Sequence, residues 1–308
     1  MSPTLRRETR VELQGRELAL SNLDKVLYPE VGFTKAEVID YYARISEVMV
    51  DHTRGRCVTL RRWPDGVAGP DFFEKNCPKH RPDWVGTARG PGRSRGEVHY
   101  CTLDEPAALV WTANLAALEV HTPMARAEQL ENPLACVFDL DPGPRTDIRN
   151  CAELAVEIRD ILAAADLQCV AKTSGSKGMQ VYVPLNGTGP EAHTHDHCAD
   201  FARAVGLLLQ QRHPGGVTVD MAKEKRPGKV FVDWSQNAFH KTTICVYSLR
   251  GRSRPTASTP LRWSEVAAGP EDPDALVFEA DAVLDRVEEF GDLFSSVLTL
   301  EQGLPSPG

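Results

Sequence analysis

The order of strand-like and helix-like patterns limits the fold of this chain more than any other feature. Short apolar runs typical of strands lie near residues 57–63, 118–121, 135–138, 168–173, 179–184, 216–220, 229–234 and 243–248. Patterns typical of helices lie near residues 35–48, 106–118, 147–166, 190–212 and 281–299. The two kinds mix without strict βαβ alternation. The sequence therefore predicts an α+β fold with mixed or antiparallel sheets flanked by helices.

Composition and the two ends of the chain indicate the class of protein. Hydrophobic residues make up 42% of the chain and charged residues 25%, which is ordinary for a soluble globular protein. The sequence has no run of about eighteen apolar residues, and its charged start lacks the apolar core of an export signal. We therefore expect a cytoplasmic protein without a membrane partner. We also expect residues 1–300 to form a single domain and residues 301–308 to be a tail or linker.

The eight cysteines are scattered along the chain without a CxxC pair. Several of them lie in apolar stretches with a strand-like or helical pattern. This distribution indicates buried thiols in a reducing cytoplasm rather than a disulfide framework.

Charge is unevenly distributed along the sequence. The formal net charge of −8 does not favour a protein that simply coats nucleic acid. Basic residues nevertheless gather at 54–62, 89–95, 223–229 and 250–254, and we expect the glycine- and arginine-rich residues 86–96 to form a flexible loop. Local patches matter more than total charge for nucleic-acid binding. A basic groove on an acidic body fits the sequence, and so does ordinary solvated surface charge.

Two aspartates, Asp139 and Asp141, end the apolar run that starts at Ala135. Side chains two residues apart on a strand point to the same face, roughly 7 Å apart. Two such carboxylates repel each other unless a cation or an arginine lies between them, and they can share a pair of divalent ions. Surface acids and nucleotide-sugar transferases show the same DxD spacing. A third acid, Asp233, lies in another apolar run, where pairing with an arginine is the alternative to metal binding.

Three further features suit phosphate binding. Residues 173–178 (TSGSKG) lie between two apolar runs, and their small side chains let backbone N–H groups approach phosphate while Lys177 adds a cation. The spacing is neither that of a P-loop nor that of a dinucleotide fingerprint, and a plain hairpin turn is the alternative. Arg250 ends a strand-like run, where a guanidinium can clamp phosphate. His121 ends another, where a histidine is more often a hydrogen-bonded core residue.

The order of these segments resembles the archaeo-eukaryotic primase superfamily, and more closely the polymerase domain of bacterial DNA ligase D. The resemblance covers about residues 15–290 and implies one primase-polymerase catalytic core within residues 1–300. It rests on LSNLDKVLYP at 20–29, RWPDG at 62–66, FFEK at 72–75, His121, DLD at 139–141, SGSKG at 174–178, VDW at 232–234 and YSLR at 247–250.

The resemblance implies a role for each matching position. Asp139, Asp141 and Asp233 would hold two Mn²⁺ or Mg²⁺ ions beside a nucleoside triphosphate. The implied nucleotide-binding residues are Arg61, His121, Ser174, Lys177, Gln180 and Arg250. The implied DNA-binding residues are Asn22, Lys25, Lys35, Phe72, Phe73, Arg226 and Gln236. In this comparison Asn22 and the two lysines grip a 5′-phosphate, and the two phenylalanines stack on template bases.

The implied activity is that of a DNA-directed polymerase that accepts ribonucleotides as well as deoxyribonucleotides. It would fill gaps and extend ends during double-strand break repair by non-homologous end joining, at the nucleoid. The implied partners are DNA with a 5′-phosphorylated gap or broken end, a Ku-type end-binding protein and a DNA ligase. A DxD-dependent nucleotide-sugar transferase and a non-catalytic DNA-end-binding module are the alternatives.

One position departs from the family pattern. Gln180 stands where the pattern SGxKGxH has histidine. A glutamine side chain still donates a hydrogen bond, but it carries no positive charge and shuttles no proton. We therefore expect metal and nucleotide binding to be retained and catalysis to be altered.

Overall fold

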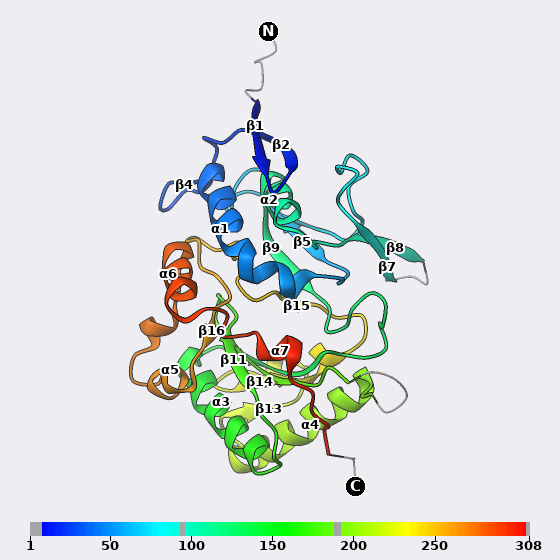
Figure 1. Ribbon diagram of the computed structural model, residues 1–308. Helices are drawn as coiled ribbons and strands as arrows, with labels where there is room; N and C mark the ends of the chain where they lie inside the picture. The colour runs from blue at the N-terminus through cyan, green and yellow to red at the C-terminus, as the bar shows by residue number, and fades with distance from the viewer. Residues whose placement is uncertain (1–7, 93–95, 188–191, 306–308) are drawn as a thin grey trace.

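The computed structural model describes residues 8–92, 96–187 and 192–305. Two layers lie one above the other, the first formed mainly by the N-terminal half of the chain and the second by the C-terminal half (Figure 1). Buried apolar side chains form two clusters that correspond to these layers. Helices combine with mostly antiparallel strand pairing, which confirms the predicted α+β class.

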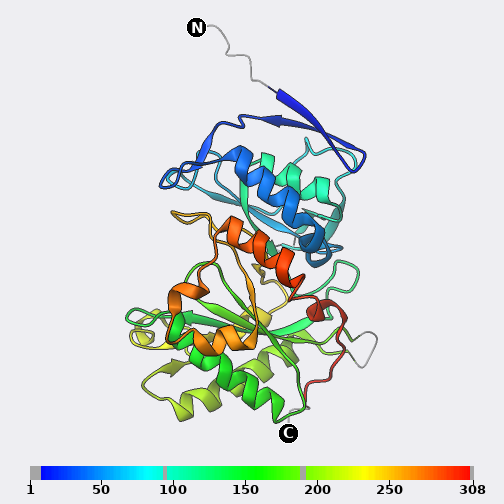
Figure 2. The ribbon, with the colours of Figure 1, turned by 60° about the vertical axis from the view of Figure 1, so that its left-hand side comes forward.

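A six-stranded sheet forms the second layer, in the order β13-β14-β10-β12-β11-β16. Its strands are β10 (Ala135–Pro142), β11 (Val170–Thr173), β12 (Met179–Pro184), β13 (Val217–Thr218), β14 (Val230–Asp233) and β16 (Pro260–Leu261). Helices α3 (Ile148–Ala163) and α4 (His195–Arg212) cover one face of this sheet (Figure 2). Apolar residues between the two helices and the sheet bury that face. The opposite face of the sheet is turned toward the first layer.

A four-stranded sheet forms the first layer, in the order β15-β9-β5-β6. Its strands are β5 (Thr59–Arg62), β6 (Phe72–Glu74), β9 (Ala117–Thr122) and β15 (Thr243–Ile244). Helices α1 (Lys35–Thr53) and α2 (Pro106–Asn114) pack on each other and on this layer. As predicted, α1 begins at a capping box, in which the Thr34 hydroxyl and the Glu37 carboxylate bond each other's backbone N–H groups.

The remaining elements lie around the two sheets. They are the hairpin of β1 (Glu8–Leu13) and β2 (Arg16–Ser21), the pair β3 (Val26–Tyr28) and β4 (Phe33–Thr34), the pair β7 (Thr87–Pro91) and β8 (Glu97–Cys101), the helices α5 (Trp263–Ala268), α6 (Ala280–Phe290) and α7 (Ser296–Thr299), and the short 3-10 helices η1 (Lys223–Lys225), η2 (Trp234–Asn237) and η3 (Pro273–Leu276). Within the described ranges, the helices are too short or too polar to cross a bilayer.

Two predictions about local structure were wrong. Residues 87–91 of the predicted loop at 86–96 form a strand, because β7 and β8 pair from Thr87 with Cys101 to Pro91 with Glu97, and residues 93–95 lie outside the described part. The predicted tail helix is two helices, because Gly291 adopts a left-handed conformation with φ of 67° and ends α6.

The start of the predicted tail packs on the rest of the protein. Leu304 is buried, and the Gln302 side chain forms hydrogen bonds with the backbone of Gln168 and Pro184. The limits of the domain stay a prediction.

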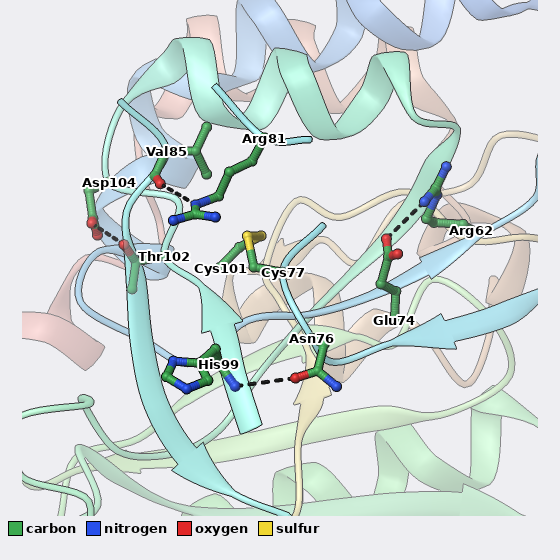
Figure 3. Close-up of a disulfide and its surroundings, with 10 residues drawn as sticks. All are labelled: Arg62, Glu74, Asn76, Cys77, Arg81, Val85, His99, Cys101, Thr102 and Asp104. Carbon is green, nitrogen blue, oxygen red and sulfur yellow. Dashed lines mark hydrogen bonds and ion pairs between the residues drawn. A yellow bond between two sulfur atoms is a disulfide. The ribbon is translucent and has the colours of Figure 1, made fainter. Parts of the chain in front are cut away.

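The prediction about cysteines was wrong for one pair. Cys77 and Cys101 form a disulfide, with Cα atoms 4.8 Å apart, that links the segment after β6 to β8 (Figure 3). Backbone pairing brings the two together, since the Cys77 N–H donates to the carbonyl of His99 at 2.7 Å. The other six cysteines, all within the described residues, are free thiols and mostly buried, as expected.

Labelling of thiols tests this bond. Protein denatured without reductant should take up thiol reagent at six of its eight cysteines, and reduction should expose the other two. Closing a loop of this length stabilises a fold by about 3 kcal/mol, so Cys77→Ser should lower the free energy of unfolding by about that amount. Cys169→Ser, which removes a half-buried free thiol, is the control. Labelling of all eight cysteines without reductant would contradict the disulfide.

Candidate active site

The register of the six-stranded sheet aligns two of the predicted acids. Asp139 on β10 is the direct partner of Asp233 on β14 and, on its other side, of Gln180 on β12. Gln180 is in turn the partner of Lys172 on β11. Partnered residues of neighbouring strands point to the same face. Lys172, Gln180, Asp139 and Asp233 therefore form one line across the sheet, called the central row below. Asp141 lies two residues after Asp139 on the same face.

Burial and repulsion between neighbouring carboxylates raise the pKa values of Asp139 and Asp141. Asp139 and Asp233 are each 8% exposed. Burial raises the pKa of Asp139 to about 7, and the charges of Asp141 and Asp233 add to this effect. Burial and the charge of Asp233 also raise the pKa of Asp141. The fold thus holds Asp139 and Asp141 in a place that disfavours their ionisation.

The acids suit hard divalent ions by their chemistry, although their side chains are not yet arranged as ligands. Carboxylate oxygens are the ligands that Mg²⁺ and Mn²⁺ prefer. The Asp233 Oδ1 accepts from the backbone N–H and the hydroxyl of Ser235, at 3.0 and 2.6 Å. Among the described residues, no three acid, histidine or cysteine side chains are already gathered closely enough to hold a metal. Rotation of side chains on a fixed backbone would have to complete such a site.

The Gln180 side chain is fixed by hydrogen bonds to Asp139 and to Tyr182. Its amide donates to Asp139 Oδ1 at 2.9 Å, and its carbonyl oxygen accepts from the Tyr182 hydroxyl at 3.0 Å. The Tyr182 hydroxyl also bonds the Thr243 hydroxyl on β15 at 3.0 Å, with Thr243 as the donor since the Tyr182 proton goes to Gln180, and this bond ties the two sheets together. The glutamine therefore orients one carboxylate oxygen of Asp139 without adding charge.

Lys172 is a buried cation that the sequence analysis did not predict. It is 1% exposed, and its amine donates to the Ile244 carbonyl and the Ser258 hydroxyl at 3.1 and 2.7 Å. Burial lowers its pKa to about 7, whereas the charge of Asp139 raises it. Lys172 stands at one end of the central row and partly offsets the negative charge of the acids.

The turn at residues 174–178 lies against the end of β10. The Ser174 hydroxyl accepts from the backbone N–H groups of Ser176 and Gly178, at 3.3 and 3.1 Å. A Cβ at Gly178 would lie 2.3 Å from the Leu140 carbonyl oxygen, so only glycine allows this approach. Gly175 has φ of 66°, which also favours glycine. The turn places Lys177 near Asp139 and Asp141.

A cavity of about 370 Å³ joins most of the predicted residues. Its acidic side holds Asp139 and Asp141, and its other walls carry basic and polar side chains. Those that the sequence analysis predicted are His121, Ser174, Lys177, Gln180, Arg226, Gln236 and Arg250. Arg252 also lines this cavity and was not predicted. Asp233 and Arg61 are outside the lining, Asp233 at the far end of the central row.

Two buried polar atoms in this lining have no hydrogen-bond partner among the described residues. They are the Nε of Arg226 and the Oε1 of Gln236. The Arg226 guanidinium lies 3.8 Å from the centre of the Phe231 ring, which holds it in place. A buried polar atom without a partner is costly unless a ligand or water supplies one. This favours a bound polar ligand at that side of the cavity.

The two predicted stacking residues lie at the rim of the first layer. Phe72 and Phe73 on the edge strand β6 are 44% and 57% exposed. The Phe73 ring lies 5.7 Å from the His121 ring, and the Arg61 guanidinium lies 5.1 Å from the centre of the Phe73 ring. Exposed aromatic rings in this position present flat apolar surface next to the cavity.

The predicted 5′-phosphate residues form a separate group near the start of α1. The Lys25 N–H donates to the Asn22 carbonyl and the Lys35 N–H to the Lys25 carbonyl, at 3.1 and 2.8 Å. The Lys35 amine is buried and donates to the Ser21 carbonyl at 2.6 Å, while the Lys25 amine pairs with Asp65 at 2.8 Å. The structure brings these three residues together, but they do not line the 370 Å³ cavity.

Protons should compete with metal at the acids. Because the pKa of Asp139 is raised to about 7, the folded chain takes up a proton there that the unfolded chain does not. Mn²⁺ affinity should therefore fall by about tenfold per pH unit for each proton displaced as pH drops below 7. Without metal, the stability contribution of Asp139 should decrease as pH rises through 7.

Calorimetry and thermal unfolding between pH 5.5 and 8.5 test this prediction. Asp139→Asn should melt higher than the native chain at pH 8 without metal, and it should lose the Mn²⁺-induced rise in Tm. Asp160→Asn, at an exposed acid paired with Arg159, is the control. Mn²⁺ affinity that is independent of pH over this range would contradict the assignment.

Comparison with known proteins places this arrangement in a family. Residues 34–294 match the sequence model of the LigD primase-polymerase domain. The multifunctional non-homologous end joining protein LigD of Mycolicibacterium smegmatis is 45% identical over 278 residues, which cover 90% of this chain and 35% of that protein. The bifunctional non-homologous end joining protein LigD of Bacillus subtilis is 30% identical over 275 residues, covering 89% of this chain and 43% of that protein.

A solved structure is similar over nearly the whole fold. The polymerase domain from Mycobacterium tuberculosis ligase D, in complex with DNA, aligns with a TM-score of 0.84 and 40% sequence identity, covering 92% of this chain and 99% of that one. This chain spans well under half the length of the curated relatives named above. The family model and the relatives together confirm the resemblance seen in the sequence motifs: the chain belongs to the LigD primase-polymerase domain family.

Proposed function

We propose that this chain is a template-dependent nucleotidyltransferase that adds ribonucleotides or deoxyribonucleotides to DNA at gaps and broken ends in non-homologous end joining. The central row beside the 370 Å³ cavity carries this proposal, because it sets Asp139 and Asp233 opposite each other next to basic side chains. The names of the LigD relatives and the DNA in the similar structure support the same activity.

The side chains in and beside the cavity have different roles in the proposed reaction. Asp139, Asp141 and Asp233 would hold two Mn²⁺ or Mg²⁺ ions. When bound, such ions activate the 3′-hydroxyl and neutralise the leaving pyrophosphate. Lys177 and Arg250 would bind phosphate oxygens of the incoming nucleotide, Arg250 with a guanidinium suited to two parallel hydrogen bonds. His121 and Arg61 would lie beside that nucleotide.

The surface around the cavity would position DNA. Phe72 and Phe73 would stack on template bases, a contact that tolerates any sequence. Asn22, Lys25 and Lys35 would hold the 5′-phosphate across the gap. Arg226 and Gln236, whose buried polar atoms lack protein partners, would meet DNA or nucleotide at the cavity edge. A Ku-type protein and a ligase activity would complete the repair.

Primer extension tests the activity directly. A gapped DNA with a downstream 5′-phosphate, incubated with Mn²⁺ and either ribo- or deoxynucleotides, should be extended as the template directs. Asp139→Ala and Asp233→Ala should each lower the rate by about 100-fold or more, because each removes a charge that the transition state requires. Asp160→Ala at the surface should not. Normal extension by Asp233→Ala would contradict the proposed metal site, and a native chain that binds DNA ends without extending them would leave only end binding.

Substitution at Gln180 tests the departure from the family pattern. The glutamine orients Asp139 but cannot carry charge, so Gln180→His should extend DNA at least as fast as the native chain and gain a dependence on pH near the pKa of histidine. Steady-state rates from pH 6 to 9 are the measurement. A slower His variant with unchanged stability would count against altered catalysis in the native chain.

A further inference from the structure

One buried carboxylate in the first layer contacts several predicted nucleotide-binding residues at once. Glu119 on β9 is 1% exposed. Its Oε1 accepts from the Arg250 Nε at 3.0 Å and from the Gly251 backbone N–H at 3.1 Å. Its Oε2 lies 2.9 Å from the His121 Nε2 and 3.6 Å from an Arg61 guanidinium nitrogen. The sequence analysis did not predict a role for this residue.

The three side chains on Glu119 come from separate parts of the chain. Arg61 on β5 is the direct strand partner of Glu119, and His121 lies two residues along β9 on the same face. Arg250 reaches Glu119 from the segment after β15. No local sequence pattern links these positions. The carboxylate is the group that all three share.

Each of these partners also extends beyond Glu119 toward the cavity or its rim. His121 and Arg250 line the cavity, and Arg250 donates a further bond to the Ser174 carbonyl at 2.8 Å. Arg61 lies against the Phe73 ring. A buried carboxylate needs several hydrogen-bond donors whatever its role. The donors of Glu119 are distinctive because His121 and Arg250 line the cavity and Arg61 lies at its rim, where a nucleotide or template would lie.

The electrostatics keep Glu119 charged and His121 in a defined form. Burial alone would raise the pKa of Glu119, but the bonds and charges of His121 and Arg250 lower it to about 2. Burial lowers the pKa of His121, against the opposing effect of Glu119. A neutral histidine that donates its Nε2 proton to a carboxylate keeps its Nδ1 as an acceptor.

We propose that Glu119 is the positioning residue of the nucleotide pocket: it sets the directions of the Arg61 and Arg250 guanidinium groups and the tautomer of His121. Glu119 itself touches no substrate in this scheme. It acts by holding three groups in the geometry that a triphosphate and its sugar require, and small errors in such geometry are costly. The proposal rests on the proposed function for the identity of the ligand.

Glu119→Gln is the variant that tests it, because glutamine keeps the shape and removes the charge. Calorimetric titration with Mn²⁺ and ATP, without DNA, should show binding weakened by roughly 10- to 100-fold. In extension assays the nucleotide KM should rise by a similar factor, with a smaller change in kcat. Affinity for 5′-phosphorylated DNA should stay unchanged, since Asn22, Lys25 and Lys35 lie elsewhere.

A matched control separates positioning from stability. Glu265 in α5 makes a comparable ion pair with Arg286, at 2.6 and 2.9 Å. Burial raises the pKa of Glu265, but the hydrogen bonds from Arg286 lower it to about 2, as the partners of Glu119 do there. Glu265 does not line the cavity. Glu265→Gln should lower Tm without weakening nucleotide binding. If Glu119→Gln does not fold, Glu119→Asp, which retains the charge with a shorter reach, should still weaken binding.

Nitrogen NMR of His121 gives a readout that stability alone would not change. The native chain should show the neutral form protonated at Nε2, and Glu119→Gln should show a mixture of tautomers. Unchanged ATP binding and tautomer in Glu119→Gln, or equal loss of binding in Glu265→Gln, would overturn the proposal. A native chain that binds Mn²⁺ and ATP but never extends DNA would refute the proposed function and leave the role of Glu119 standing.

Discussion

The pairing of β10 with β12 and β14 is the constraint on which the rest of the site depends. Directly opposite residues on antiparallel strands have Cα atoms about 4.5–5.5 Å apart. By placing Asp139 opposite Asp233, the register forces two like charges together where the chain would otherwise avoid them. A slip of one residue would turn every side chain of β10 to the other face and bury the acids among apolar helices. Helices α3 and α4 prevent that slip, because they need the apolar face of the sheet.

The site has an acidic group and a basic group, and one buried residue of opposite charge lies beside each of them. Lys172 stands at the end of the central row that carries the acids. Glu119 lies between the cations Arg61 and Arg250. Both buried residues form hydrogen bonds with groups from distant segments, Lys172 with Ser258 and Ile244, and Glu119 with Gly251. Such pairing lets charges stay in a low-dielectric site that would expel isolated ones.

Local patterns were enough to predict the elements that carry the acids, but not the residues that support them. The apolar run before Asp139 and the capping box at Thr34 are visible in a few consecutive residues, and the structure has both. Lys172 and Glu119 are single charges within short strands, and such residues usually face solvent. Their burial depends on partners 72 to 132 residues away. The β7–β8 hairpin was missed for a similar reason, because cross-strand pairing outweighs a composition typical of loops.

The opposed charges of the cavity restrict what can fill it. A simple anion would be attracted by Lys177, Arg226 and Arg250 but repelled by Asp139 and Asp141. A metal ion alone would satisfy the acids and leave the basic side chains without a partner. A nucleoside triphosphate with divalent ions carries both signs in one ligand and neutralises both sets. Arg226 and Gln236, each with a buried polar atom that lacks a partner among the described residues, also line this cavity. The charge pattern thus favours a metal–nucleotide complex over either component alone.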